Sequence, residues 1–220
     1  MTGRPRALLF DLGNVCLPFD HGRMVGQLAA LFEVPDECVR AALLDSEALL
    51  KIEQGLVSDD ELHANLCTQF GRQVDRRTLF DAASDIFTPN PEMETLLAEL
   101  AAGELPLILV SNTSRPHIEF VRREYDILAN FDRLVLSYEV KASKPDPAFY
   151  RHAVKVAGAE VAGAEVASAQ VAGVSPGDCF FTDDVPVNVA GAADFGMDAV
   201  LFESAAQLRR ELATRGVLTD

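Results

Sequence analysis

The sequence predicts an α/β protein: a Rossmann-like parallel sheet core that carries an inserted α-helical cap. Short apolar runs recur along the chain, and segments with helical periodicity separate them, which is the pattern of a parallel sheet covered by helices. One long segment near the N-terminus shows helical patterns alone. With 220 residues, 49% of them hydrophobic, the chain is long enough for a core domain with a smaller insert.

Five apolar runs are predicted to form the strands of the sheet. They lie at residues 6–10, 106–110, 133–137, 178–182 and 198–202. The segment 91–102 shows how the intervening helices are recognised, because its leucines recur on one helical face. Asn90 and Pro91 are typical of a helix start, and Gly103 is typical of a helix end.

Residues 18–88 are predicted to form the helical cap, and residues 1–17 and 89–220 the core. The 18–88 segment contains several amphipathic patterns, and a capping box from Ser58 to Glu61 marks the start of one helix. Because the cap follows the first strand, we expect it to cover the carboxyl ends of the strands. Open α/β sheets bind their ligands there.

A pentapeptide repeat occupies residues 156–173, where VAGAE, VAGAE, VASAQ and VAG follow one another. A period of five residues matches neither a helix nor a strand, so the repeat cannot keep one face apolar for long. Its alanines and acidic residues favour a helix, whereas each glycine costs about 1 kcal/mol there. We expect a frayed helical extension or a mobile loop, without a binding role.

The composition excludes several classes of function. A net charge of −15 argues against a nucleic-acid partner and means that local cations or backbone amides must hold an anionic substrate. No apolar run approaches the roughly 18 residues that span a bilayer, and the N-terminus lacks a signal-peptide core, so we expect a cytoplasmic protein without a membrane partner. Buried free thiols are predicted for the widely spaced cysteines Cys16, Cys38, Cys67 and Cys179.

Polar side chains end or follow four of the apolar segments. They are Asp11 in FDLGNV (10–15), Ser111 and Asn112 in LVSNT (109–113), Lys144 in KASKPDPAFY (141–150), and Asp183 and Asp184 in FFTDDVPVN (180–188). Taken singly, most of these residues have an equally good explanation as helix caps or turn residues. Because the carboxyl ends of parallel strands share one edge of the sheet, we expect the four motifs to converge.

The residue types indicate a phosphate site with a metal ion. Two adjacent carboxylates repel each other unless a cation lies between them, which favours Mg²⁺ with its oxygen ligands. Ser111 and Asn112 can donate to a phosphoryl oxygen, and the amides of a helix that starts near Arg115 face the same anion. Lys144 is a candidate for the cation beside the phosphate, with Lys141 as the alternative.

The ordered set of four motifs resembles the haloacid dehalogenase superfamily of hydrolases, over residues 6 to about 202. The resemblance implies a Mg²⁺-dependent phosphatase that acts on a small phosphate ester through an aspartyl-phosphate. By position, it implies that Asp11 is the nucleophile, that Ser111 and Asn112 hold the phosphoryl oxygens, and that Lys144 neutralises the developing charge. A carboxylate can attack phosphorus only when such cations relieve the charge repulsion.

The same resemblance implies the metal ligands. Asp11 and Asp184 would bind Mg²⁺ directly, together with the backbone carbonyl of Gly13, whereas Asp183 would bind the metal's water or orient Lys144. Gly13 is also a departure, because phosphatases of this family usually place an acid/base aspartate there. Asn14 follows where glycine is usual, and asparagine tolerates a left-handed turn better than most residues.

The missing aspartate bears on the substrate. Loss of a positioned general acid costs on the order of 10² to 10⁴ in rate, and less for a good leaving group. The DLGNV variant resembles a subgroup that includes bacterial glucose-1-phosphatases, which favours a sugar phosphate. Asp20 or His21, just beyond the first motif, is the candidate replacement for the missing acid.

Two other functions remain open at this stage. A metal-independent 2-haloacid dehalogenase also lacks the second aspartate, although a metal-free site gains nothing from adjacent acids such as Asp183 and Asp184. A binding or regulatory member of the family, impaired in catalysis, is supported by Gly13 alone.

Overall fold

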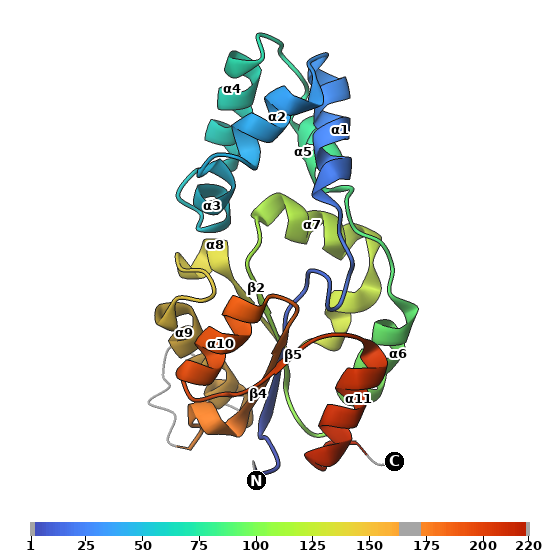
Figure 1. Ribbon diagram of the computed structural model, residues 1–220, viewed down its shortest axis with the longest axis vertical. Helices are drawn as coiled ribbons and strands as arrows, with labels where there is room; N and C mark the ends of the chain where they lie inside the picture. The colour runs from blue at the N-terminus through green and yellow to red at the C-terminus, as the bar shows by residue number, and fades with distance from the viewer. Residues whose placement is uncertain (1–2, 163–172, 219–220) are drawn as a thin grey trace.

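The computed structural model describes residues 3–162 and 173–218, and it shows a parallel sheet with helices on both faces (Figure 1). The strands are β1 (Ala7–Phe10), β2 (Leu107–Ser111), β3 (Arg133–Leu136), β4 (Cys179–Asp183) and β5 (Asp198–Leu201), in the order β3-β2-β1-β4-β5. Each strand lies within one residue of its predicted bounds. The predicted fold class is therefore confirmed.

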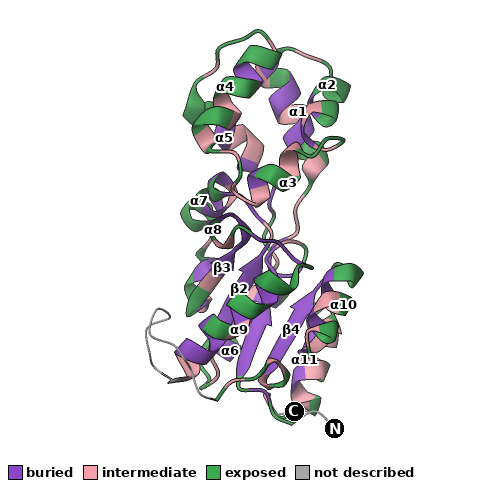
Figure 2. Ribbon diagram, turned by 90° about the vertical axis from the view of Figure 1, so that its left-hand side faces the viewer, coloured by how far each residue is buried: buried purple, intermediate pink, exposed green. Residues whose placement is uncertain are grey.

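The two faces of the sheet bury alternate residues of each strand. In β1, Leu8 and Phe10 belong to one apolar cluster, and Ala7 and Leu9 belong to the other. The first cluster packs under α6 (Pro91–Ala101), α7 (Arg115–Glu124), the 3-10 helix η1 (Asp126–Asn130) and α11 (Ala205–Thr214). The second packs under α9 (Pro147–Ala162) and α10 (Pro186–Asp194). The central strands are accordingly buried along their length (Figure 2).

A helical insert lies between β1 and β2, as predicted, and stands beyond the carboxyl ends of the strands (Figure 1). Its helices are α1 (His21–Phe32), α2 (Asp36–Leu43), α3 (Ala48–Glu53), α4 (Asp59–Gln69) and α5 (Arg76–Ser84). The capping box of Ser58 and Glu61 starts α4. The two segments that join the insert to the core run side by side, where Phe19 and Phe87 form an antiparallel bridge. The bounds 18–88 for a cap domain stay a prediction; the insert is called the cap below.

One helix was not expected, and one local prediction is wrong. The one-turn helix α8 (Ser137–Val140) lies between β3 and the segment that carries Lys144. Cys38 is exposed, whereas the other three cysteines are buried and all four are free. Cys38 is exposed because the buried residues of α2 are Val39 and Leu43, and its own side chain lies outside that stripe.

The pentapeptide repeat begins within α9, which extends to Ala162. Residues 163–172 of the repeat lie outside the described residues, so the expected frayed helix or mobile loop stays a prediction. A short 3-10 helix, η3 (Pro176–Asp178), leads from there into β4. In the described ranges, no helix combines the length and the apolar character that crossing a membrane requires.

Candidate active site

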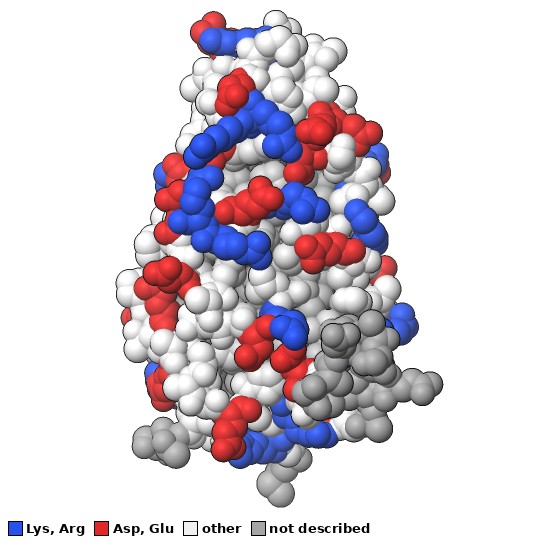
Figure 3. Space-filling view, turned by 180° about the vertical axis from the view of Figure 1, so that it is seen from behind, with Lys and Arg blue, Asp and Glu red and all other residues white. Residues whose placement is uncertain are grey.

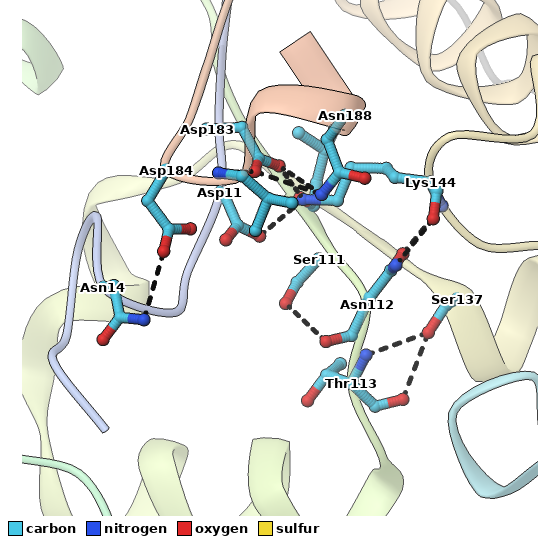
Figure 4. A network of polar contacts seen from close by, with 12 residues as sticks. Asp11, Asn14, Ser111, Asn112, Thr113, Ser137, Lys144, Asp183, Asp184 and Asn188 are labelled. Atoms are coloured by element: carbon cyan, nitrogen blue, oxygen red, sulfur yellow. Dashed lines mark hydrogen bonds and ion pairs between the residues drawn. The ribbon is translucent and has the colours of Figure 1, made fainter. Parts of the chain in front are cut away.

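The four motifs meet at the carboxyl edge of the sheet, around the end of β1 (Figure 4). The chain order reverses at β1, since β2 lies on one side of it and β4 on the other. Such a switch point opens a crevice that binds ligands in open α/β sheets. Asp11 follows β1 directly, and its N–H donates to the Thr182 carbonyl of β4 at 3.0 Å.

Lys144 lies at the centre of this site. Its Nζ donates to Asp11 Oδ1 at 2.6 Å, to Asp183 Oδ2 at 2.6 Å and to the Val110 carbonyl at 2.8 Å. These three acceptors satisfy all three donors of the ammonium group. Burial by itself lowers the pKa of Lys144, but the charges of Asp11 and Asp183 outweigh it and hold the pKa above its ordinary value. The buried lysine therefore stays charged, whereas Lys141 is exposed and lies outside this network.

Asn112 holds the backbone of Lys144. Its Nδ2 donates to the Lys144 carbonyl at 2.9 Å, and its Oδ1 accepts from the Lys144 N–H at 2.8 Å. This pair of bonds gives the Asn112 side chain a positioning role, and its expected contact with a phosphoryl oxygen stays a prediction. Ser111 ends β2, and its hydroxyl has a long contact of 3.5 Å with the Asn112 carbonyl, too weak to keep it from donating to a ligand.

Asp183 is completely buried and surrounded by donors. Its Oδ1 accepts from the Val185 N–H at 2.8 Å, and Asn188 Nδ2 lies 3.1 and 3.2 Å from its two oxygens. Together with the bond from Lys144, these contacts match the second of the two roles expected for Asp183, the orientation of Lys144. Asn188 itself was not recognised from the sequence, although its place in the first turn of α10 after the two aspartates is a usable signal.

Asp184 is held by Asn14, a second residue that the sequence analysis did not place in the site. Asn14 Nδ2 donates to Asp184 Oδ2 at 3.1 Å, and Asn14 adopts the expected left-handed backbone with φ of 54°. Burial raises the pKa of Asp184, and the bond from Asn14 opposes that rise. Asp184 is half-buried and lies on the opposite side of Asp11 from Lys144 (Figure 4).

Three carboxylates lie close together here, and two of them, those of Asp11 and Asp183, are paired with Lys144. Asp11, Asp183 and Asp184 each offer an oxygen within 4.8 Å of the others. Burial raises the pKa of Asp11 to about 7, although the charge of Lys144 opposes the rise. This excess of buried negative charge on hard oxygen atoms fits a divalent cation such as Mg²⁺.

The Phe19 ring occupies the space that a side chain at residue 13 would need. A Cβ on Gly13 would lie 2.6 Å from Cε1 and 2.9 Å from Cδ1 of the Phe19 ring. The ring is itself held, with its centroid 4.8 Å from that of His21 and 6.3 Å from that of Phe87. The packing around residue 13 therefore leaves no room for an aspartate side chain.

A cavity separates this edge of the sheet from the cap. The core contributes Gly13, Ser111 and Asn112 to its lining, and the cap contributes His21 and Glu53. Burial raises the pKa of Glu53 to about 7, with the charge of Lys144 opposing the rise. Glu53 was not recognised from the sequence, because neither its position nor its neighbours form a motif.

The two residues expected to replace the missing acid differ in position. Asp20 is exposed and N-caps α1, where its Oδ1 accepts from the Gly22 N–H at 2.7 Å. His21 does line the cavity, and burial lowers its pKa against the opposing charge of Asp20.

A larger cavity of about 560 Å³ lies near Arg4, Arg6 and Asp132, away from the acidic cluster. The candidate active site is therefore identified by the chemistry of its residues and not by the volume of its cavity.

Comparison with known proteins shows which family the chain belongs to. The description of the matching family is haloacid dehalogenase-like hydrolase, and the match covers residues 5–196. Flavin mononucleotide hydrolase 1 of Arabidopsis thaliana is 29% identical over 168 residues, which are 76% of this chain and 62% of that protein. Drimenol cyclase drtB of Aspergillus calidoustus is 28% identical over 211 residues, 94% of this chain and 36% of that protein. The chain thus spans less than two thirds of both relatives.

Solved structures share the fold. The HAD family enzyme BT-2542 of Bacteroides thetaiotaomicron superposes with a TM-score of 0.75 at 24% identity, over 94% of this chain and 98% of that one. A further structure of BT-2542 contains magnesium and inorganic phosphate. The L-2-haloacid dehalogenase of Xanthobacter autotrophicus superposes with a TM-score of 0.58 at 20% identity, over 98% of this chain and 85% of that one.

Proposed function

The chain belongs to the haloacid dehalogenase-like hydrolases, and from this premise we propose that it is a Mg²⁺-dependent phosphatase of small phosphate monoesters. One observation carries the proposal: Asp11 lies in a cluster of three carboxylates and is bonded to a buried lysine. The hydrolase activity in the name of the Arabidopsis relative, and the magnesium and phosphate bound to BT-2542, support the same chemistry.

Mg²⁺ would be held by Asp11, Asp184 and the backbone carbonyl of Gly13. When bound, it supplies the positive charge that lets a carboxylate approach a phosphate dianion. Asp183 has its acceptors occupied by Lys144, Asn188 and Val185, so it orients the lysine.

Asp11 acts as the nucleophile. One of its carboxylate oxygens forms a bond to phosphorus as the bond between phosphorus and the leaving oxygen breaks. Lys144 compensates the negative charge that develops on the phosphoryl oxygens, and Ser111 donates a hydrogen bond to them. Because Asn112 and Asp183 already fix Lys144, little reorganisation is needed during the reaction. Water then displaces the aspartyl group from phosphorus and regenerates the Asp11 carboxylate.

The leaving group needs a proton or must be stable without one. Gly13 supplies no acid, so a good leaving group such as the hydroxyl of a sugar 1-phosphate is favoured. We therefore propose a sugar phosphate as the substrate, in line with the similarity of the first motif to the glucose-1-phosphatase subgroup. Flavin mononucleotide, named in the Arabidopsis relative, belongs in the same substrate screen.

The test is hydrolysis of p-nitrophenyl phosphate. We expect activity with Mg²⁺, loss of activity with EDTA, and recovery when Mg²⁺ is added back in excess. Asp11→Asn should reduce turnover to the level of the reaction without enzyme, because an amide cannot form the acyl phosphate. Asp126→Asn, the same substitution at an exposed residue of η1, serves as the control and should retain activity.

Two outcomes would contradict the proposal. Chloride release from 2-chloropropionate in the presence of EDTA, without phosphate release from p-nitrophenyl phosphate, would indicate a metal-independent dehalogenase. Full activity of Asp11→Asn would show that Asp11 is not the nucleophile.

A further inference from the structure

We propose that Glu53 of the cap is a catalytic residue that protonates the leaving-group oxygen, the role that Gly13 leaves vacant. This inference rests on the proposed phosphatase function. It goes beyond that function because it assigns an acid on the cap, outside the four motifs of the core.

The backbone around Glu53 is fastened to the core. Glu53 is the last residue of α3, and the next two residues both contact the segment that ends in Lys144. Gln54 Nε2 donates to Ser143 Oγ at 3.2 Å, and Lys141 Nζ donates to the Gly55 carbonyl at 2.6 Å. These contacts hold the end of α3 over the site, so the position of Glu53 relative to the core is defined.

The Glu53 side chain lines the cavity that also contains Gly13 and Ser111. It therefore lies on the side of the phosphoryl site from which a leaving group would depart toward the cap. Within residues 3–162 and 173–218, the Glu53 carboxyl group makes neither a hydrogen bond nor an ion pair. A partly buried carboxyl without a partner destabilises the fold, so a purely structural role does not explain it.

Of the three titratable groups His21, Glu53 and His117 that line this cavity, Glu53 is best suited to donate a proton near neutral pH. Burial raises the pKa of Glu53 to about 7, and the charge of Lys144 limits the rise, so a large share of the group carries a proton near neutral pH. His21 and His117 face the same cavity, and burial lowers the pKa of both, to about 4 for His117. Both imidazoles are therefore mostly neutral, and a general acid works best with a pKa near the operating pH.

Glu53 loses one proton in the first half-reaction and regains one in the second. As an Asp11 oxygen bonds to phosphorus, the bond from phosphorus to the leaving oxygen breaks, and that oxygen takes the proton of Glu53. In the second half-reaction, the Glu53 carboxylate takes a proton from water as the water oxygen bonds to phosphorus and the bond to Asp11 breaks. Inorganic phosphate leaves, Asp11 is a carboxylate again, and Glu53 again carries its proton.

The experiment compares two substrates of similar shape that differ in their need for protonation. Phenyl phosphate releases a poor leaving group, whereas p-nitrophenyl phosphate releases one that is stable as an anion. For Glu53→Gln we expect kcat on phenyl phosphate to fall about 10²- to 10⁴-fold and kcat on p-nitrophenyl phosphate to fall less than about 10-fold. Glu47→Gln, at the exposed start of the same helix, is the matched control and should change neither rate.

The two rates measured for Glu53→Gln either support or overturn its assignment as the acid. An equal loss on both substrates by a folded Glu53→Gln protein, or no loss on either, would overturn the assignment of Glu53 as the acid. Failure of the proposed function itself has a different signature, because the wild-type protein would then hydrolyse neither ester with Mg²⁺. Thermal unfolding of both variants establishes that a loss is not caused by misfolding.

Discussion

Gly13 illustrates how a single residue shapes the chemistry available to this site. Any side chain there meets the ring of Phe19, which is wedged between His21 and Phe87. An aspartate therefore fits at this position only if the Phe19 ring moves. An acid that protonates the leaving group therefore has to be a residue other than residue 13, as in the proposed role of Glu53.

Gly13→Ala should destabilise the protein by about 1–3 kcal/mol, because the added methyl group overpacks the contact with Phe19. Urea unfolding measures the effect. Gly26→Ala is the control, since a Cβ on this residue of α1 meets nothing within 4 Å and the substitution should stabilise the helix by up to about 1 kcal/mol. In a Phe19→Ala background the cost of Gly13→Ala should shrink; an unchanged cost would show that Phe19 is not the cause.

At the scale of elements, the turn that follows α3 connects the cap with the core. Gly55 has a φ of 60°, and a Cβ there would lie 2.4 Å from the Tyr138 carbonyl oxygen and 2.5 Å from Lys141 Nζ. The close approach of two backbones thus requires glycine at this position. Glu53 lies two residues before Gly55, so we expect a movement of this turn to displace the Glu53 carboxyl group in the cavity.

Gly55→Ala should lower kcat more than Gly71→Ala does, because the turn that contains Gly55 must move away from α8. Gly71→Ala provides a matched control: Gly71 also has a positive φ, of 67°, but a Cβ there meets nothing within 4 Å. Both variants carry backbone strain of about 1–2 kcal/mol, and the collision with the core affects Gly55→Ala alone. Equal activities of the two variants would show that docking of this turn does not matter for turnover.

At the scale of the whole molecule, the candidate active site lies where the cap meets the switch point of the sheet, far from the chain termini (Figure 1). The protein carries a net charge of −15, yet on the face shown in Figure 3 acidic and basic side chains are interleaved. Surface ion pairs join Arg123 to Asp81 and Arg76 to Asp60. A cytoplasmic location and the lack of a nucleic-acid partner stay predictions.

Mg²⁺ should stabilise the folded protein, because the cation relieves repulsion among three carboxylates, only two of which are paired with Lys144. At 100 times the dissociation constant the gain is about 2.7 kcal/mol. For a chain of this length, that corresponds to a rise in Tm of about 5–10 °C. Asp184→Asn should abolish the rise, and the exposed Asp126→Asn should keep it. A wild-type Tm that does not respond to Mg²⁺ would contradict the metal site.

Much of the fold was predictable because it depends on local sequence. Short apolar runs that alternate with helical patterns identify the strands, and asparagine tolerates the left-handed conformation that Asn14 adopts better than most residues do. The resemblance of the four motifs assigned roles to residues such as Asp11 and Lys144, and the carboxyl edge of a parallel sheet brings them together. Their hydrogen bonds and burial agree with this convergence.

The remaining features depend on contacts between segments that are distant in the sequence. Asn14 and Asp184 are 170 positions apart, and Asn112 and Lys144 are 32 apart. No periodicity encodes such pairs, so only the tertiary structure showed that Asn112 positions the lysine, that Phe19 fills the space beside Gly13, and that Glu53 reaches the cavity. The local sequence therefore determined which elements form and where the reactive residues lie on them. Packing of the cap against the core decided which further side chains surround those residues.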